Sequence, residues 1–195
     1  MLSCNTPLAR AKSKVDGHWI ISRQYLDMSN VNVVGDRRLY MPANQTTLAT
    51  YTDESKNHIC RISNCLYEQV DPYTFGLCSN HNDRNGEPLF VGDIISNNWC
   101  YCEDYAIVCF GEYKSSNMSN DYPQGHYGFY VQSLAPTRSG RELLRKDILY
   151  FANQCVIVGN IYDNPDLVRA SVGKENELYK QLFGHLQERE KNDGH

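Results

Sequence analysis

The sequence predicts a mainly β fold of the α+β type, a small, strongly bent sheet or partly open barrel that ends in a C-terminal helix. Short apolar runs of strand length alternate with turn-forming clusters of Gly, Asn, Asp and Ser. Asp83-Arg84-Asn85-Gly86 predicts a tight turn, because Asp bonds to nearby backbone and Asn-Gly tolerates positive φ. Gly92-Asp93 interrupts the following strand, as a bulge or bend does.

In the N-terminal half, strands are expected over residues 18–26, 39–41 and 58–70. Residues 27–57 are polar and predict a long irregular excursion. The apolar spacing over 58–70 fits a strand or a helix. A strand is preferred there because Asp71-Pro72 ends the run.

In the C-terminal half, an antiparallel pair is expected over residues 90–97 and 103–113. The second of these runs is apolar on both faces, which is typical of a central strand. Further strands are expected over 126–134 and 154–162, and residues 141–151 have a helical or bent character.

Two helical segments are expected after the last strand. Asn164-Pro165 is typical of a helix N-cap followed by proline at the first helical position. Residues 174–190 carry an apolar stripe at helical spacing, which has to pack against something. This helix either packs on its own domain or joins subunits.

Charge and hydropathy exclude some classes of function. The 195-residue chain has a formal net charge of −4, which argues against strong non-specific binding to nucleic acid or anionic membrane. No apolar run approaches the ~18–20 residues of a membrane-spanning helix, and residues 1–16 lack the apolar core of a secretory signal. We therefore expect a cytoplasmic protein without membrane contact.

The eight cysteines raise the question of a metal site. No pair has the Cys-x2-Cys spacing that zinc sites favour; the nearest are Cys60 with Cys65 and Cys100 with Cys102. Reduced, mostly buried thiols are the preferred interpretation, with zinc as the open alternative. No metal or cofactor is expected.

Four segments resemble the YopX family, which bacteriophages and prophages carry. The segments are Gly17-His18-Trp19-Ile20, Val70 to Gly76, Asn82 to Ile95, and Val156 to Leu167. The resemblance covers roughly residues 9–168 and implies one β-rich, SH3-like domain over 1–168, which a helical tail over 169–195 follows. Leu77 to His81 departs from the family pattern, and the tail extends beyond it.

The resemblance provides no active site, since the family lacks an established catalytic residue. The residues that carry it are interpreted as fold determinants at turns and close backbone approaches: Asp71, Pro72, Asp83, Gly86, Gly92, Asp93, Gly159, Asn160, Asn164 and Pro165. Asp93 in particular is expected to cap the backbone at the Gly92 bend.

Candidate ligand-binding residues come from an aromatic cluster and a basic one. The run Gly125-His126-Tyr127-Gly128-Phe129-Tyr130 either lines a site where rings stack on a base or packs within a sheet or an oligomer interface. The basic segment that follows either contacts phosphates or is a solvated face. The candidates are Tyr127, Phe129, Tyr130, Arg138, Arg141 and Arg145.

The preferred function is a phage or prophage accessory protein that acts as a non-catalytic binding or oligomeric module. A homo-oligomer with a host or phage protein partner is expected. One alternative is a protein that binds or sequesters a nucleotide or small ligand at a subunit interface. Another, less favoured, is nucleic-acid binding through a local basic patch. An enzyme is not favoured, because no phosphate loop, nucleophile elbow or zinc-protease motif is present.

Overall fold

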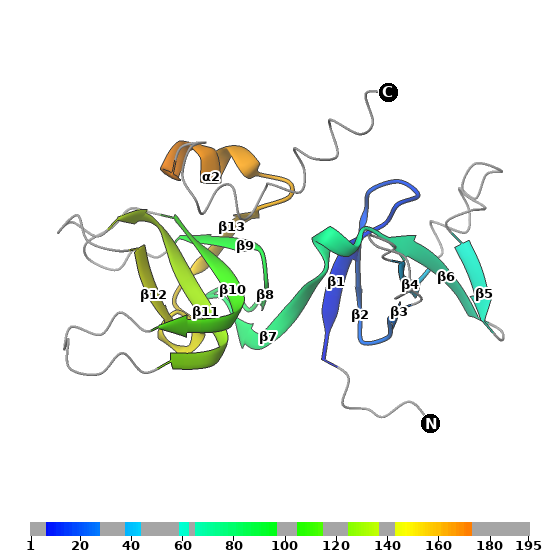
Figure 1. Cartoon of the computed structure of the whole chain (residues 1–195), viewed down its shortest axis with the longest axis horizontal. Coiled ribbons are helices and arrows are strands. Elements are labelled where there is room, and N and C mark those ends of the chain that lie inside the picture. Colours follow the sequence, from blue (N-terminus) through cyan, green and yellow to red (C-terminus); the bar gives the residue numbers. More distant parts are fainter. Residues whose placement is uncertain are drawn as a thin grey trace. The chain divides into compact units, whose positions relative to one another are not determined.

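The computed structural model describes residues 7–27, 38–43, 59–62, 65–96, 105–114, 125–136 and 143–172 (Figure 1). Its contacts divide the chain into two compact units, Met1–Asn80 and His81–His195. Strand β7 (Gly76–Asn82) runs from the first unit into the second. The mainly β prediction is confirmed, and the described strands form open sheets.

The first unit is built from short antiparallel strands. Its elements are β1 (Ala9–Lys12), β2 (Trp19–Ser22), β3 (Leu26–Asp27), β4 (Leu39–Pro42), β5 (Ile59–Ile62), β6 (Cys65–Val70) and the 3-10 helix η2 (Pro72–Thr74). β1 pairs with both β2 and β7, and a second sheet has the order β3-β4-β6-β5. The buried core between these strands consists of Ala9, Ala11, Ile20, Met41 and Val70.

Two expectations for this unit need correction, and one strand was missed. The strand expected over 18–26 is two strands, β2 and β3, and the one expected over 58–70 is the antiparallel pair β5 and β6. Strand β1 was not predicted. Its sequence Ala-Arg-Ala-Lys has no β-branched or aromatic residue, and only the burial of two small alanines marks its inner face.

The second unit contains a five-stranded antiparallel sheet of order β12-β11-β10-β9-β13. The elements of the second unit are β8 (Pro88–Phe90), β9 (Asp93–Ser96), β10 (Tyr105–Lys114), β11 (Gly125–Pro136), β12 (Leu143–Asp147), the 3-10 helix η3 (Ile148–Tyr150), β13 (Val156–Asn160) and α2 (Pro165–Val172). Residues 143–147, expected to be helical or bent, are therefore a strand, and only η3 after them is helical.

β10 is a central strand, as the apolar residues on both of its faces predicted. Ile107 on one face and Val108 on the other are fully buried. Ile107 packs with Val168 of α2, and Val108 packs with Ile148 of η3. α2 begins at Pro165, where the sequence places it, and it includes the predicted domain boundary after residue 168. The tail helix expected over 174–190 lies outside the described residues. Among the described helices, none is long and apolar enough to cross a membrane.

The turn before β8 is organised by the buried carboxylate of Asp83, which is 2% exposed. Its Oδ1 accepts from the backbone N–H groups of Asn85 (2.7 Å) and Glu87 (3.0 Å). Its Oδ2 accepts from the N–H of Ile157 in β13, at 3.2 Å. Gly86 completes the turn with a φ of 86°. One carboxylate thus joins this turn to a strand 74 residues further along the chain.

Burial alone raises the pKa of Asp83, and it is the largest single effect. The hydrogen bonds from Glu87, Ile157 and Asn85 together outweigh it, so the pKa lies below the ordinary value of 3.8. A lowered carboxyl pKa stabilises the fold above the unfolded-state value, and that stabilisation is lost as the pH falls through the folded-state value.

Two glycines allow close contacts that a side chain would block, one at the Gly92 bend and one at Gly159 in β13. Gly92 has a φ of 90°, and a Cβ there would lie 3.1 Å from the ring of Tyr162. Asp93 caps this bend, because its Oδ2 accepts from the N–H of Phe90 at 2.7 Å. A Cβ on Gly159 would lie 2.3 Å from Oδ1 of Asn164. Without it, Asn164 Oδ1 accepts from the N–H of Asn160 at 3.2 Å.

The remaining turn residues also bond to backbone. Asp71 precedes η2 and accepts from the N–H of Tyr73 at 3.1 Å, with Pro72 as the first residue of η2. Asn160 Oδ1 accepts from the N–H groups of Tyr162 and Asp163, both at 2.9 Å.

We expect Asp83→Asn to destabilise the second unit by about 1–3 kcal/mol at pH 7, because the amide turns an N–H toward the partly buried N–H of Ile157. Wild-type protein should lose stability as the pH falls below 3.8, and the variant should lose less over that range. Calorimetric unfolding between pH 3 and pH 7 measures both effects.

The control is Asp163→Asn, the same change in an exposed turn, with an expected cost below about 0.5 kcal/mol. Equal costs for the two variants at pH 7 would show that Asp83 has no special structural role.

Candidate functional site

The β10–β11 pair places aromatic side chains on both faces of the second unit. The two strands are in register from Ala106 opposite Ser133 to Lys114 opposite Gly125. Phe110 lies opposite Phe129 and Tyr113 lies opposite His126. Since directly opposed residues in an antiparallel pair share a face, the two aromatic pairs lie on opposite faces.

One face carries an exposed aromatic cluster of Phe110, Tyr127 and Phe129. Tyr127 is 72% exposed and Phe110 is 41% exposed. Phe110 meets Tyr127 edge to face, with the ring centroids 5.3 Å apart, and it also contacts Phe129 at 4.7 Å. Phe129 in turn packs against the buried core around Val131. The cluster is therefore anchored at one end and open to solvent at the other.

The other face carries three stacked rings. Tyr113 lies nearly parallel to Tyr130, with centroids 4.7 Å apart and planes 20° apart. It also lies nearly parallel to His126, at 5.2 Å and 25°. Tyr113 is the shared member, so Tyr130 and His126 are the ends of the stack. Tyr113 is buried, whereas His126 is exposed.

Asp147, at the end of β12, fixes the central ring of the stack. The hydroxyl of Tyr113 donates to Oδ2 of Asp147 at 3.1 Å, and Oδ1 of the same carboxylate accepts from the N–H of Leu149 in η3 at 2.9 Å. Burial, followed by the negative charge of Asp147, raises the pKa of Tyr113. The hydroxyl therefore remains a proton donor at neutral pH. The bond to Asp147 holds the hydroxyl of Tyr113, and Tyr130 and His126 stack on its ring.

An open pocket of about 570 Å³ lies at the end of the β10–β11 pair. Its volume lies within the range of small-molecule sites, ~300–1,000 Å³. Its described lining combines aromatic rings with one carboxylate and one ammonium group: Glu112, Tyr113, Lys114, Gly125, His126 and Tyr127. By the strand register, Glu112, Lys114 and Tyr127 lie on the face of the Phe110 cluster, whereas Tyr113 and His126 lie on the other face.

The candidate residues named from the sequence do not form one set. Tyr127 and Phe129 share the exposed face, whereas Tyr130 lies on the opposite face under Tyr113. Arg138 and Arg141 lie outside the described residues. Arg145 lies in β12 opposite Gln132. Tyr113, Glu112 and Lys114 were not singled out, because only the strand register shows that they meet the aromatic run.

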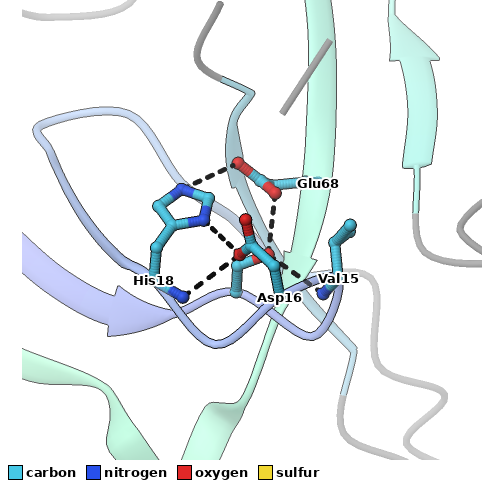
Figure 2. A network of polar contacts seen from close by, with 5 residues as sticks. Val15, Asp16, His18 and Glu68 are labelled. Atoms are coloured by element: carbon cyan, nitrogen blue, oxygen red, sulfur yellow. Dashed lines mark hydrogen bonds and ion pairs between the residues drawn. The ribbon is translucent and has the colours of Figure 1, made fainter. Parts of the chain in front are cut away.

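A second polar cluster lies in the first unit, where the β1–β2 turn meets β6 (Figure 2). The carboxylate of Glu68 is fully buried, and its Oε2 accepts from the hydroxyl of Ser13 at 2.7 Å. Its Oε1 lies 3.5 Å from Nε2 of His18, whose Nδ1 contacts Asp16. Ser13 Oγ also accepts from the N–H of Val15 at 3.0 Å.

This cluster has residue types found in hydrolases but not their arrangement. A nucleophilic serine donates to a histidine base, whereas Ser13 donates to a carboxylate and is buried. Hydrogen bonds from His18 and its nearby charge lower the pKa of Asp16, although burial, the largest single effect, acts in the opposite direction. The cluster fastens the β1–β2 turn to β6 and is structural.

Cys78 and Cys155 are buried free thiols, and no group of potential metal ligands is found within the described part of the chain. Burial, followed by the charge of Asp83, raises the pKa of Cys155 to about 11. At neutral pH this thiol is protonated and therefore a poor nucleophile.

The chain was compared with protein families and with curated proteins. No family model matches it, and no curated protein shows significant sequence similarity.

We expect Ser13→Ala to destabilise the first unit by about 1–3 kcal/mol, because it removes a donor to a buried carboxylate and an acceptor for Val15. Amide hydrogen exchange of β1 and β2 measures the change. Ser22→Ala is the matched control, since Ser22 makes an exposed bond to the N–H of Gln24 and its loss should cost below about 0.5 kcal/mol. Similar exchange rates in both variants would contradict a fastening role for the cluster.

Proposed function

We propose that the chain is a YopX-like accessory protein of a bacteriophage or prophage, which works as a non-catalytic binding or oligomeric module. The resemblance of four ordered segments supports the family. The exposed cluster of Phe110, Tyr127 and Phe129 supports the mode of action and is the observation that carries the proposal.

Exposed aromatic residues that touch one another are typical of protein–protein interfaces. Such rings supply large contact areas at low conformational cost, and they are enriched where binding energy is concentrated. Tyr127 is 72% exposed and meets Phe110 edge to face, while Phe129 holds the cluster against the core. The cluster is therefore anchored to the core through Phe129 and exposes the rings of Phe110 and Tyr127 to solvent. Its occupant in this proposal is a second copy of the chain.

A second candidate function is the binding of a small ligand. The specific observation in its favour is the pocket of about 570 Å³ at the end of the same strand pair. It needs neither a catalytic residue nor a metal. The part of the candidate site based on Arg138 and Arg141, including nucleic-acid binding through that segment, stays a prediction from the sequence.

Native mass spectrometry of the purified protein tests self-association. The wild type should appear at twice the mass of the 22.4 kDa chain or at a higher whole multiple. The double variant Phe110→Ser, Tyr127→Ser should shift to the monomer, because it replaces both exposed rings with small polar groups.

The control is Leu149→Ser, Tyr150→Ser, which removes an exposed apolar pair from η3 instead. Its oligomer should equal that of the wild type. A monomeric wild type, or a double variant that keeps the wild-type mass, argues against the proposed interface.

A further inference from the structure

The exposed face of the β10–β11 pair extends beyond Phe110 into a patch of four residues that are all exposed. This end patch consists of Glu112 and Lys114 on β10 and of Gly125 and Tyr127 on β11. Glu112 lies opposite Tyr127, and Lys114 lies opposite Gly125. Because side chains alternate along a strand and opposed residues share a face, all four lie on the same face as Phe110.

The end patch contains two charges, a projecting ring and a gap. Within the described part of the chain, neither Glu112 nor Lys114 forms an ion pair. Tyr127 is 72% exposed. A Cβ on Gly125 would have no other atom within 4 Å, so the space above this glycine is open. The patch therefore offers four features to a partner of matching shape and charge.

Each feature of the end patch has its complement two residues away on the same strand. Along β10 a carboxylate is followed by an ammonium group, and along β11 the open glycine is followed by the projecting ring. Such positions lie on one face, about 7 Å apart. In a two-fold interface, when one residue contacts a second residue of the other copy, the second also contacts the first. An axis that crosses both strands midway between these positions therefore brings each feature onto its complement.

We propose that a second copy of the chain packs on the end patch across this two-fold axis, at the level of Tyr113. β10 of one copy then lies antiparallel over β10 of the other. Glu112 of each copy pairs with Lys114 of the other, and Tyr127 of each copy covers Gly125 of the other. This inference rests on the proposed self-association and adds the geometry and the charge pairs of the contact.

Other arrangements satisfy the end patch less well. A two-fold axis parallel to the strands would set Glu112 against Glu112 or against Tyr127 of the other copy, so that no opposite charges meet. A nucleic-acid strand would bring phosphates beside Glu112, and like charges repel. An unrelated protein would need the same spacing of charges, ring and gap in reverse order, whereas a second copy has this spacing by symmetry.

Sedimentation equilibrium of the full chain tests the charge pairs through the dimer dissociation constant. Glu112→Lys and Lys114→Glu each set like charges against one another, so each should weaken the dimer by roughly tenfold or more. The double variant Glu112→Lys, Lys114→Glu exchanges the two charges and restores opposite pairs. Its dissociation constant should return to within about threefold of the wild-type value, a non-additive result that only interacting residues give.

A further variant tests the gap. Gly125→Gln places a long uncharged side chain where the ring of the other copy is to lie, and it should weaken the dimer by roughly tenfold, as a steric clash in a packed contact does. The single chain has room for this side chain, since no atom lies within 4 Å of the added Cβ.

The controls are Glu87→Lys and Lys14→Glu, which make the same two charge reversals at exposed residues outside the patch. Both should leave the dissociation constant unchanged. A double variant as weak as its two single variants combined would overturn the charge pairs, and so would single reversals that act no more strongly than the controls.

Two outcomes separate this inference from the proposed function. If Phe110→Ser, Tyr127→Ser dissociates the dimer while the charge reversals and Gly125→Gln leave it unchanged, the aromatic interface stands and only the two-fold geometry is overturned. If the wild type is monomeric at every concentration, self-association itself is overturned, and the end patch is left to a different partner.

Discussion

The second unit depends on one buried carboxylate. Asp83 accepts from two amides of its own turn and from the amide of Ile157, so it joins the start of this unit to β13 near its end. β13 pairs with β9, β9 with β10, and β10 with β11. A buried ionised group is unfavourable unless hydrogen bonds replace its hydration, and here N–H groups supply them. The carboxylate therefore constrains the fold, and the folded chain in turn supplies the N–H groups that the buried carboxylate needs.

The same sheet positions the surfaces to which we assign a function. β10 is buried on both faces at Ile107 and Val108, near its start, and its later residues pair with the start of β11, where the aromatic groups gather. Period-two alternation then separates these groups into the exposed Phe110 cluster and the stack around Tyr113. One strand pair therefore carries the exposed aromatic cluster on one face and the stacked rings on the other, and its end lines the pocket.

Local sequence was sufficient for features that local physics determines. The central position of β10 follows from apolar residues on both faces, the turn at Asp83 from Asp-x-Asn-Gly, and the start of α2 from Asn164-Pro165. Features that need tertiary contacts were missed. The partner of Asp83 is 74 residues away, and β1 has no propensity signal beyond two buried alanines. Alternation along β11 is enough to place Tyr130 and Tyr127 on opposite faces. That Tyr130 stacks with Tyr113 follows only from the register of β10 and β11.

The most direct test of the role of Asp83 is an NMR titration of its side-chain carboxyl carbon in the intact protein. If the carboxylate holds the turn and β13 together, its pKa lies below 3.8, and its titration moves the amide resonances of Glu87 and Ile157 with it. A pKa at or above the ordinary value, with the Ile157 amide unaffected, would contradict the account, because burial would then act without the hydrogen bonds that connect the turn to the sheet.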